Sequence, residues 1–174
     1  GLSTNAPETV ATIANNVLTI IKPGVFTVSG EMTGGQIVVN VDKTTYADGI
    51  VELDLSNANL TNTTTSPIYV ASIGDECAIV AKNGTSNTIS DGTSYTNADG
   101  GTGAIYSCDD LKIKGQGTLT VNGNCADAIV CKNDLKLYNG TIIANAVDDA
   151  IRGKDSVTVG NDTDTDFSSL KITA

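Results

Sequence analysis

Short runs of alternating hydrophobic and polar residues are the main pattern of this chain. Three of them are Leu111-Lys112-Ile113, Leu135-Lys136-Leu137 and Val157-Thr158-Val159, in which a polar residue stands between two apolar ones. A period of two is typical of short β-strands with one buried face. The pattern therefore predicts strands in the second half of the chain.

These runs belong to a repeated unit. Residues 104–113, 128–137 and 150–159 are near-copies, offset by 24 and then by 22 positions. A glycine and one more apolar-polar run follow the first two copies, at 117–121 and 140–144. A repeat period in the twenties is typical of folds that stack one copy on the next.

We therefore expect an all-β fold, a right-handed parallel β-helix with three short strands per coil and a period of about 22–24 residues. Equivalent residues of successive coils then lie about 4.8 Å apart. The offsets predict two buried ladders, one of Ile105, Ile129 and Ile151 and one of Leu111, Leu135 and Val157. A leucine-rich horseshoe is disfavoured because its regular leucine spacing is absent.

The first half of the chain shows the same pattern less regularly. Strands are predicted at 17–20, 25–28, 36–40, 50–55, 58–61, 68–70 and 77–80. An amphipathic capping helix from Glu8 is the alternative for the spacing of Val10, Ile13 and Val17. Residues 82–103 form a polar insertion, and long loops of this kind are usually functional or mobile.

The apolar ladders continue on both sides of the insertion, so residues 1–174 are predicted to form a single domain. The last predicted strand, 169–174, is followed by no polar cap. We therefore expect either a fragment of a longer solenoid or a subunit whose last coil is covered by another chain. An open coil end also favours end-to-end self-association, because it presents unpaired strand edges.

The charge of the chain narrows its partners and its location. The net charge is −10 with a pI near 4.1, and histidine is absent. Such a chain lacks the basic footprint of a nucleic-acid-binding protein, and imidazole catalysis is excluded. No apolar run is long enough to insert into a membrane. The acidic surface favours an extracellular or cell-surface protein, or one that holds metal ions.

Four cysteines, Cys77, Cys108, Cys125 and Cys131, allow three full pairings. None has the CxxC spacing of zinc sites or redox motifs. In the expected register Cys131 lies on Ser107, beside Cys108, so a Cys108–Cys131 disulfide is the favoured pairing. Cys77 aligns with buried Leu111 and is expected to be a core thiol.

Acidic turns are the main candidates for chemistry. The 22-residue offset places Asp127 under Asp149, with Asp148 at the same corner. Carboxylates that stack about 5 Å apart repel one another unless a cation or a proton lies between them. Hard oxygen ligands of this kind suit Ca²⁺. The alternative is that such turns are simply rich in Asp and Asn; calcium is the favoured interpretation at this corner.

Two further polar ladders border the same short strand. The same offsets predict one of Asp109, Asn133 and Asp155 and one of Asp110 and Asp134. They either complete a second calcium site or cap solvated turns, and the sequence does not decide between these.

Three cations lie close to these turns. Lys132 and Lys154 are expected one coil apart, next to Arg152. They are candidates for gripping a sugar carboxylate. The alternative, which is slightly favoured, is that they neutralise the neighbouring aspartates.

Several segments, taken together, resemble a known family. They are residues 84–92, 109–113 with 117–121, and 148–157. They are similar to the carbohydrate-binding β-helix proteins of anaerobic, plant-fibre-degrading bacteria, over most of residues 17–159. The resemblance implies a pectate-lyase-like fold, bound calcium and binding of acidic plant polysaccharides such as polygalacturonate. The arrangement of Asp127 and Asp148-Asp149 also resembles the calcium corner of some pectate lyases.

Three functions follow from these observations. The favoured one is a non-catalytic, calcium-dependent extracellular module that binds acidic plant polysaccharide. The first alternative is a calcium-stabilised structural subunit that stacks end to end into a surface fibre. The second is a uronate lyase, but β-elimination needs a base near the substrate, and only Lys132, Lys154 and Arg152 lie near the predicted corner.

Overall fold

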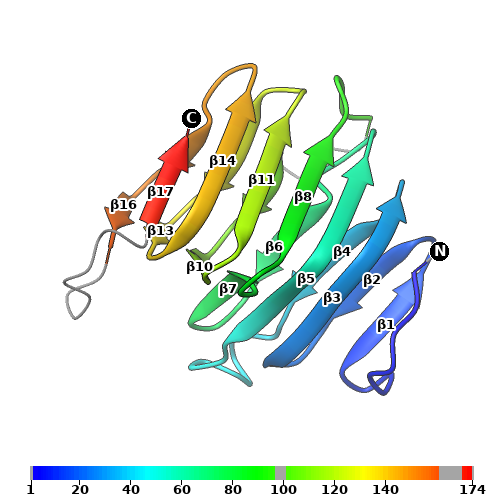
Figure 1. Ribbon diagram of the computed structural model, residues 1–174. Helices are drawn as coiled ribbons and strands as arrows, with labels where there is room; N and C mark the ends of the chain where they lie inside the picture. Colours follow the sequence, from blue (N-terminus) through cyan, green and yellow to red (C-terminus); the bar gives the residue numbers. More distant parts are fainter. Residues whose placement is uncertain (1, 97–100, 161–169, 174) are drawn as a thin grey trace.

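The computed structural model describes residues 2–96, 101–160 and 170–173 (Figure 1). Every regular element in these ranges is a β-strand. The strands stack along one direction, and the two chain ends lie at opposite ends of the stack (Figure 1). No helix in the described ranges is long and apolar enough to cross a membrane.

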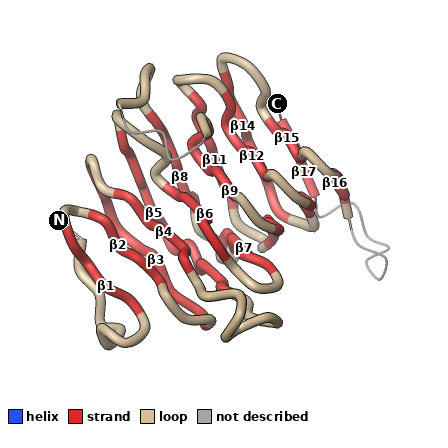
Figure 2. Tube along the Cα trace, turned by 180° about the vertical axis from the view of Figure 1, so that it is seen from behind, coloured by secondary structure: helices blue, strands red, loops and turns tan. Residues whose placement is uncertain are grey.

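One side of the molecule is a seven-stranded sheet. Figure 2 shows the molecule from behind, with this sheet toward the viewer. In spatial order its strands are β1 (Ala11–Ala14), β2 (Val17–Ile20), β4 (Gln36–Asn40), β6 (Ile68–Ser72), β9 (Gly103–Ser107), β12 (Asp127–Cys131) and β15 (Ile151–Gly153). β1 and β2 form an antiparallel hairpin, and the other neighbours are parallel.

A ten-stranded sheet forms the rest of the molecule. Its strands are β3 (Gly24–Thr33), β5 (Val51–Asn62), β7 (Glu76–Ala81), β8 (Ser86–Asp91), β10 (Asp110–Lys114), β11 (Thr118–Gly123), β13 (Asp134–Leu137), β14 (Gly140–Ala146), β16 (Ser156–Val159) and β17 (Leu170–Thr173). The first half of β5 pairs with β7 and its second half with β8, so the sheet divides there. We call the two parts of the divided sheet its wings. One wing continues from β7 through β10, β13 and β16, and the other continues from β8 through β11, β14 and β17.

The predicted register between copies of the repeat is confirmed. Ile129 lies between Ile105 and Ile151, and Leu135 lies between Leu111 and Val157. The alternation of apolar and polar residues sets this register, because a slip by one residue would turn every apolar side chain outward.

The predicted right-handed β-helix with three short strands per coil and a period of 22–24 residues is wrong. The strands form two sheets, one of them mixed and the other curled around the core. β5 is one strand of 12 residues where the coil needs two short strands. Cys77 lies beside Leu111 and Ile68 beside Ile105, so the spacing in the first half far exceeds the predicted period.

Two local features explain these differences. Asn57 bends β5 at a φ of 54° without ending it, so no corner separates the two predicted strands. The predicted polar insertion at 82–103 contains the strand β8, which pairs with β5 and β11, so an additional strand separates β7 from β9 along the chain. Neither feature recurs at the repeat offset, so the repeat alone did not predict them.

The chain begins with a β-hairpin and not with the alternative capping helix. β1 and β2 are joined by Asn15 and Asn16, whose φ values are 51° and 61°. Two central residues with positive φ are the signature of the tight turn that matches the twist of two antiparallel strands.

A continuous hydrophobic core fills the space between the sheets. It consists mainly of Val, Ile, Leu and Ala side chains, which agrees with the low aromatic content of 4%. The packing weakens at the C-terminal end, where Val157 is 44% and Val159 is 55% exposed. Their partners Leu135 and Leu137 in the preceding strand are fully buried.

Candidate functional site

A cluster of lysines lies on the wing formed by the first half of β5 with β7, β10 and β13. Its outward side chains are Glu52, Glu76, Lys112, Lys114 and Lys136, which we call the lysine wing. Lys112 and Lys136 occupy paired positions on neighbouring parallel strands. Their backbones are therefore about 4.8 Å apart.

Glu76 joins these two lysines. Its side chain is only 7% exposed, and its two carboxylate oxygens accept hydrogen bonds from Lys112 and from Lys136, the latter at 3.2 Å. Burial raises the pKa of Glu76, but the two lysine hydrogen bonds outweigh burial, so the pKa lies below its ordinary value. Glu76 therefore stays ionised and holds both ammonium groups on one side.

An aromatic ring borders the lysine wing. Lys112 Nζ lies 5.3 Å from the centroid of the Tyr138 ring. Nearby, Lys114 forms an ion pair of 2.8 Å with Glu52. The wing thus offers two ammonium groups, a partly exposed aromatic ring and hydrogen-bond donors on a rigid sheet.

The predicted ladder of Asp110 and Asp134 lies at the edge of this wing. The Asp134 amide donates to Asp110 Oδ1 at 3.4 Å, and the Ser156 hydroxyl donates to Asp134 Oδ1 at 2.7 Å. Asp110 also pairs in register with Glu76. The structure therefore brings Asp110 and Asp134 together, on the same wing as the lysines.

The second predicted ladder does not gather its three side chains. The Asp109 carboxylate pairs with Lys43 and accepts a hydrogen bond of 3.0 Å from the Ile73 amide. Asn133 and Asp155 meet through the backbone, with the Asp155 amide 3.4 Å from the Asn133 carbonyl oxygen. Asp109 is thus a buried structural carboxylate, separate from the other two.

The predicted calcium corner contains an arginine. Asp127, the first residue of β12, does lie beside Asp149, which precedes β15, and the Asp149 amide donates to Asp127 Oδ1 at 3.0 Å. Arg152 Nη2 lies 2.6 Å from Asp127 Oδ2, and Arg152 Nη1 lies 3.8 Å from Asp149 Oδ2. Asp148 is exposed. Each oxygen of Asp127 has a partner, one the Asp149 amide and the other Arg152, so the cation at this corner in the structure is the Arg152 guanidinium.

The described part of the chain holds no group of three or more Asp, Glu, Cys or His side chains arranged to bind a metal. We therefore assign no chemical step to calcium.

The three cations predicted to bind sugar have different surroundings. Arg152 is held by the two aspartates, and its Nε is buried without a hydrogen-bond partner. Lys132 Nζ lies 5.9 Å from the centroid of the Tyr106 ring. Lys154 is exposed and follows Gly153, which pairs with Cys131. Of the three, Lys154 is the exposed one, whereas Lys132 and Arg152 are partly buried.

All four cysteines are free thiols, so the structure does not contain the expected Cys108–Cys131 disulfide. Cys131 does pair in register with Ser107, as predicted, but its thiol is buried and donates to the Asp109 and Asp134 carbonyl oxygens. The Cys108 thiol instead contacts the Tyr69 hydroxyl at 3.7 Å. Burial raises the pKa of the Cys131 thiol to about 11, which leaves it unreactive.

The other wing, formed by the second half of β5 with β8, β11 and β14, has a different surface. We call it the hydroxyl wing, and its outward residues are Asn59, Thr61, Ser86, Thr88, Ser90, Thr118, Thr120, Asn122, Thr141, Ile143 and Asn145. None of these is charged. Asn122 donates to Ser90 at 2.8 Å, and Asn145 donates to Asn122 at 2.9 Å. Apart from Ile143, the hydroxyl wing is thus an uncharged grid of hydroxyl and amide groups.

The sequence did not predict that the residues of either wing form one continuous surface. Lys112 and Lys136 were visible as the polar residues of two repeat copies, but their partner Glu76 lies in a strand outside the regular repeat. The hydroxyl wing was visible as the alternation in Thr118-Leu119-Thr120-Val121-Asn122. The missing information was which strands lie side by side.

The sequence of the chain matches a family of binding proteins. A sequence model of the carbohydrate-binding domain-containing proteins matches residues 14–169, so the chain belongs to this family. One curated relative of that name, from Acetivibrio thermocellus, is 37% identical over 138 residues. The match covers 77% of this chain and 46% of the relative, so the chain spans about half of that protein's length.

A solved structure is also similar. It is the polysaccharide lyase-like protein from C. thermocellum, in a gadolinium derivative. The TM-score is 0.71 at 29% sequence identity, over 94% of this chain and 72% of the solved one. The expected resemblance to a carbohydrate-binding family is therefore confirmed, and the family name describes binding, not catalysis.

Proposed function

We propose that this chain is a non-catalytic, extracellular module that binds acidic plant polysaccharide, of the polygalacturonate type, on the lysine wing. The observation that carries the proposal is the arrangement of Lys112 and Lys136 around Glu76, beside the ring of Tyr138. Membership of a carbohydrate-binding family supports the general class of ligand.

The lysine wing has the chemistry that a uronate needs. A uronate carboxylate forms charge-assisted hydrogen bonds with ammonium groups. Lys112 and Lys136 share one carboxylate, so each keeps donors that Glu76 does not use. The apolar face of a sugar ring packs on an aromatic side chain, and Tyr138 supplies one next to Lys112.

The lysine wing also answers the objection that an acidic protein repels an acidic polymer. The whole chain carries a net charge of −10. On the lysine wing, three lysines face two glutamates that are already paired with them. Asp110 and Asp134 at the edge of the wing outweigh this balance, so an acidic polymer is held by direct hydrogen bonds to the ammonium groups and not by a positive local charge. Binding is expected to weaken with salt because the lysines are partly exposed.

The same ion pairs argue against catalysis. A lyase needs a base that is free to take a proton from the substrate. Hydrogen bonds to Glu76 raise the pKa of Lys136 despite its partial burial, which keeps it protonated. Arg152 is held by Asp127 and Asp149. Incubation with polygalacturonate is expected to produce no unsaturated product, measured by ultraviolet absorbance.

Gel electrophoresis with polygalacturonate in the matrix tests the proposal. Retardation of the chain is expected, with a loss of at least about tenfold in affinity for Lys112→Ala/Lys136→Ala, since each charge-assisted hydrogen bond contributes about 1.5–3 kcal/mol. Lys22→Ala/Lys171→Ala is the matched control, because it removes the same charge outside the lysine wing. Equal retardation of both double variants would exclude the lysine wing as the binding surface.

The hydroxyl wing favours a second candidate function, the binding of neutral polysaccharide. Its outward residues carry no charge although the chain is strongly acidic, and they present regularly spaced hydroxyl and amide groups. Sedimentation with an insoluble neutral glucan tests this candidate. Thr120→Asp is expected to abolish co-sedimentation, and Lys112→Ala to leave it unchanged; the opposite pattern excludes the hydroxyl wing.

A further inference from the structure

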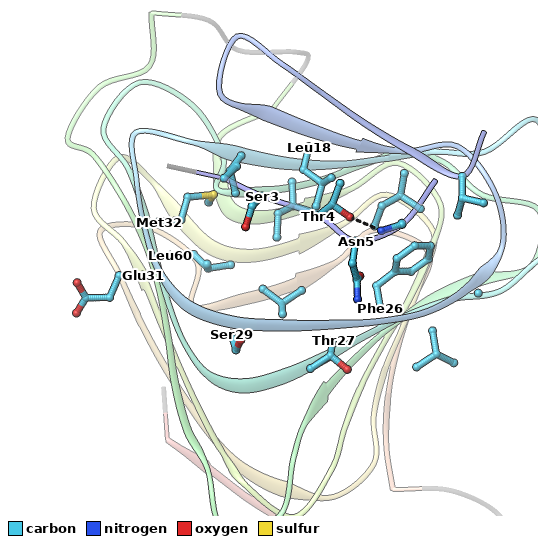
Figure 3. Close-up of a pocket in the computed structure, with 18 of the residues that line it drawn as sticks. Ser3, Thr4, Asn5, Leu18, Phe26, Thr27, Ser29, Glu31, Met32 and Leu60 are labelled. Atoms are coloured by element: carbon cyan, nitrogen blue, oxygen red, sulfur yellow. Dashed lines mark hydrogen bonds between the residues drawn. The ribbon is translucent and has the colours of Figure 1, made fainter. Parts of the chain in front are cut away.

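A cavity of about 910 Å³ lies at the N-terminal end of the molecule, between β2 and β3 (Figure 3). Its inner wall is apolar and includes Leu18, Phe26, Met32 and Leu60. In the middle of the stack the inward-facing side chains are almost completely buried, but Leu18, Phe26 and Val28 at this end remain partly exposed. This end of the core is therefore hollow, in contrast to its packed middle.

The segment of residues 2–6 crosses the mouth of this cavity. Leu2 and Ala6 pack against the hydrophobic core, and the Ala6 amide donates to Thr4 Oγ1 at 3.0 Å within the segment. In the close-up view, Ser3 lies on the side of Met32, and Asn5 lies on the side of Phe26 (Figure 3). Among the described residues, no backbone hydrogen bond joins residues 2–6 to a strand.

The lining combines two kinds of groups. Apolar side chains and one aromatic ring form the inner wall, whereas Ser3, Thr4 and Asn5 bring hydroxyl and amide groups to the mouth. Small-molecule sites are concave and use polar groups to orient the ligand. Here polar groups make up more than half of the exposed lining, so the site suits a ligand that has both an apolar body and a hydrogen-bonding group. The volume also lies in the range of such sites, about 300–1,000 Å³.

The charge of the lining restricts the ligand. Glu31 is the charged residue that lines the cavity, and no lysine or arginine is among the lining residues. A carboxylate or phosphate would leave water without a cationic partner in the lining, and the Glu31 carboxylate itself points away from the cavity (Figure 3). Charged anionic ligands are therefore disfavoured.

We propose that this cavity is a binding site for an uncharged small molecule with an aromatic or alicyclic body and a hydroxyl group at one end. The body lies against Phe26, Met32 and Leu60, and the hydroxyl group meets the polar side chains of residues 3–5 at the mouth. The cavity is separate from both wings, so this proposal does not rest on polysaccharide binding.

The absence of tryptophan from the chain allows a direct test. Phe26→Trp places one fluorophore in the cavity, and Val147→Trp places one at a residue that is 73% exposed, outside the cavity lining. The probe is 4-nitrobenzyl alcohol, an uncharged quencher with a ring and a hydroxyl group. Saturable quenching is expected for Phe26→Trp and linear, collisional quenching for Val147→Trp. Linear quenching of both variants would overturn the proposal.

A second measurement keeps the test valid if Phe26→Trp disturbs the fold. Saturation-transfer NMR of the unsubstituted chain is expected to show transfer to 4-nitrobenzyl alcohol. Ala6→Phe, which adds a ring at the cavity mouth, is expected to reduce this transfer several-fold, and the anion 4-nitrobenzoate to bind at least about tenfold more weakly. No transfer in the unsubstituted chain, or equal binding of alcohol and anion, would refute the site as proposed. Lys112→Ala/Lys136→Ala is expected to leave the transfer unchanged, which separates this result from the polysaccharide test.

Discussion

Arg152 Nη2 lies 2.6 Å from Asp127 Oδ2, in the corner where the sequence predicted a calcium ion. Asp127 is 1% exposed and lies beside Asp149. A buried carboxylate in that position needs a positive partner. The partner in the structure is a guanidinium from the adjacent strand.

Arg152→Ala is expected to destabilise the fold. It leaves the Asp127 carboxylate buried without its cation, which costs about 2–4 kcal/mol of the free energy of unfolding, somewhat less than for a fully buried pair because Arg152 is partly exposed. Asp149→Asn is the comparison, since the Asp149 side chain is 53% exposed and its pair with Arg152 is long; a change of less than about 1 kcal/mol is expected. Urea denaturation measures both, and equal effects would contradict the assigned role of Arg152.

Calcium binding stays a prediction that calorimetry tests. If Ca²⁺ binds, the structure favours Asp110 and Asp134, which lie together, over the corner occupied by Arg152. The binding heat is therefore expected to disappear in Asp110→Asn/Asp134→Asn and to persist in Asp149→Asn. Loss of the heat in Asp149→Asn alone would show that Arg152 leaves the corner when calcium is present. Retardation by polygalacturonate with and without chelator then shows whether calcium contributes to polysaccharide binding.

Glu76 is expected to make stability depend on pH. Its pKa in the folded chain lies below the ordinary 4.5, because the hydrogen bonds from Lys112 and Lys136 outweigh the effect of burial. The ionised carboxylate therefore stabilises the fold above the ordinary pKa, and this stabilisation is lost as the pH falls through the lowered value. Glu76→Gln is expected to lower the free energy of unfolding by about 1–3 kcal/mol at pH 7.

The difference between Glu76→Gln and the unsubstituted chain should then shrink on acidification to pH values below the folded pKa. Denaturant titrations at neutral and acidic pH measure it. A difference that is independent of pH would show that the charge of Glu76 contributes nothing beyond its hydrogen bonds.

End-to-end association also stays a prediction. The last described strands, β15, β16 and β17, lie at the sheet edges, and Val157 and Val159 of β16 are exposed. Val159→Lys places a charge at this edge and is expected to reduce any concentration-dependent light scattering, because charged edges oppose strand pairing. Scattering that is unaffected by Val159→Lys would place the contact elsewhere.

Much of the local structure was predictable from the sequence. The ladder of Ile105, Ile129 and Ile151 and the neighbouring positions of Asp127 and Asp149 follow from the repeat offset, and the structure confirms them. The reason is that a strand with one buried face admits one register. The membership of a carbohydrate-binding family was also visible in the sequence, and the family match confirms it.

The partner of each charge was decided only in three dimensions. Arg152 and Asp127 are separated by 25 residues, and Lys136 and Glu76 by 60. A hydrophobic pattern specifies which face of a strand is buried. It does not specify which of several nearby groups a long, flexible, charged side chain contacts. Coordination by calcium and pairing with arginine satisfy the same rule for Asp127, so the sequence alone did not distinguish them.

The sequence by itself determined that this protein is built from strands, how its repeat copies align and which family it belongs to. The division into two sheets, the lysine wing, the hydroxyl wing and the hollow N-terminal end were decided only by the tertiary structure. The physical reason is the separation along the chain over which each effect acts. Alternation and turn chemistry act between residues that are close in sequence. The path of β5, bent at Asn57, and the placement of Glu76 beside two later lysines depend on contacts between distant segments.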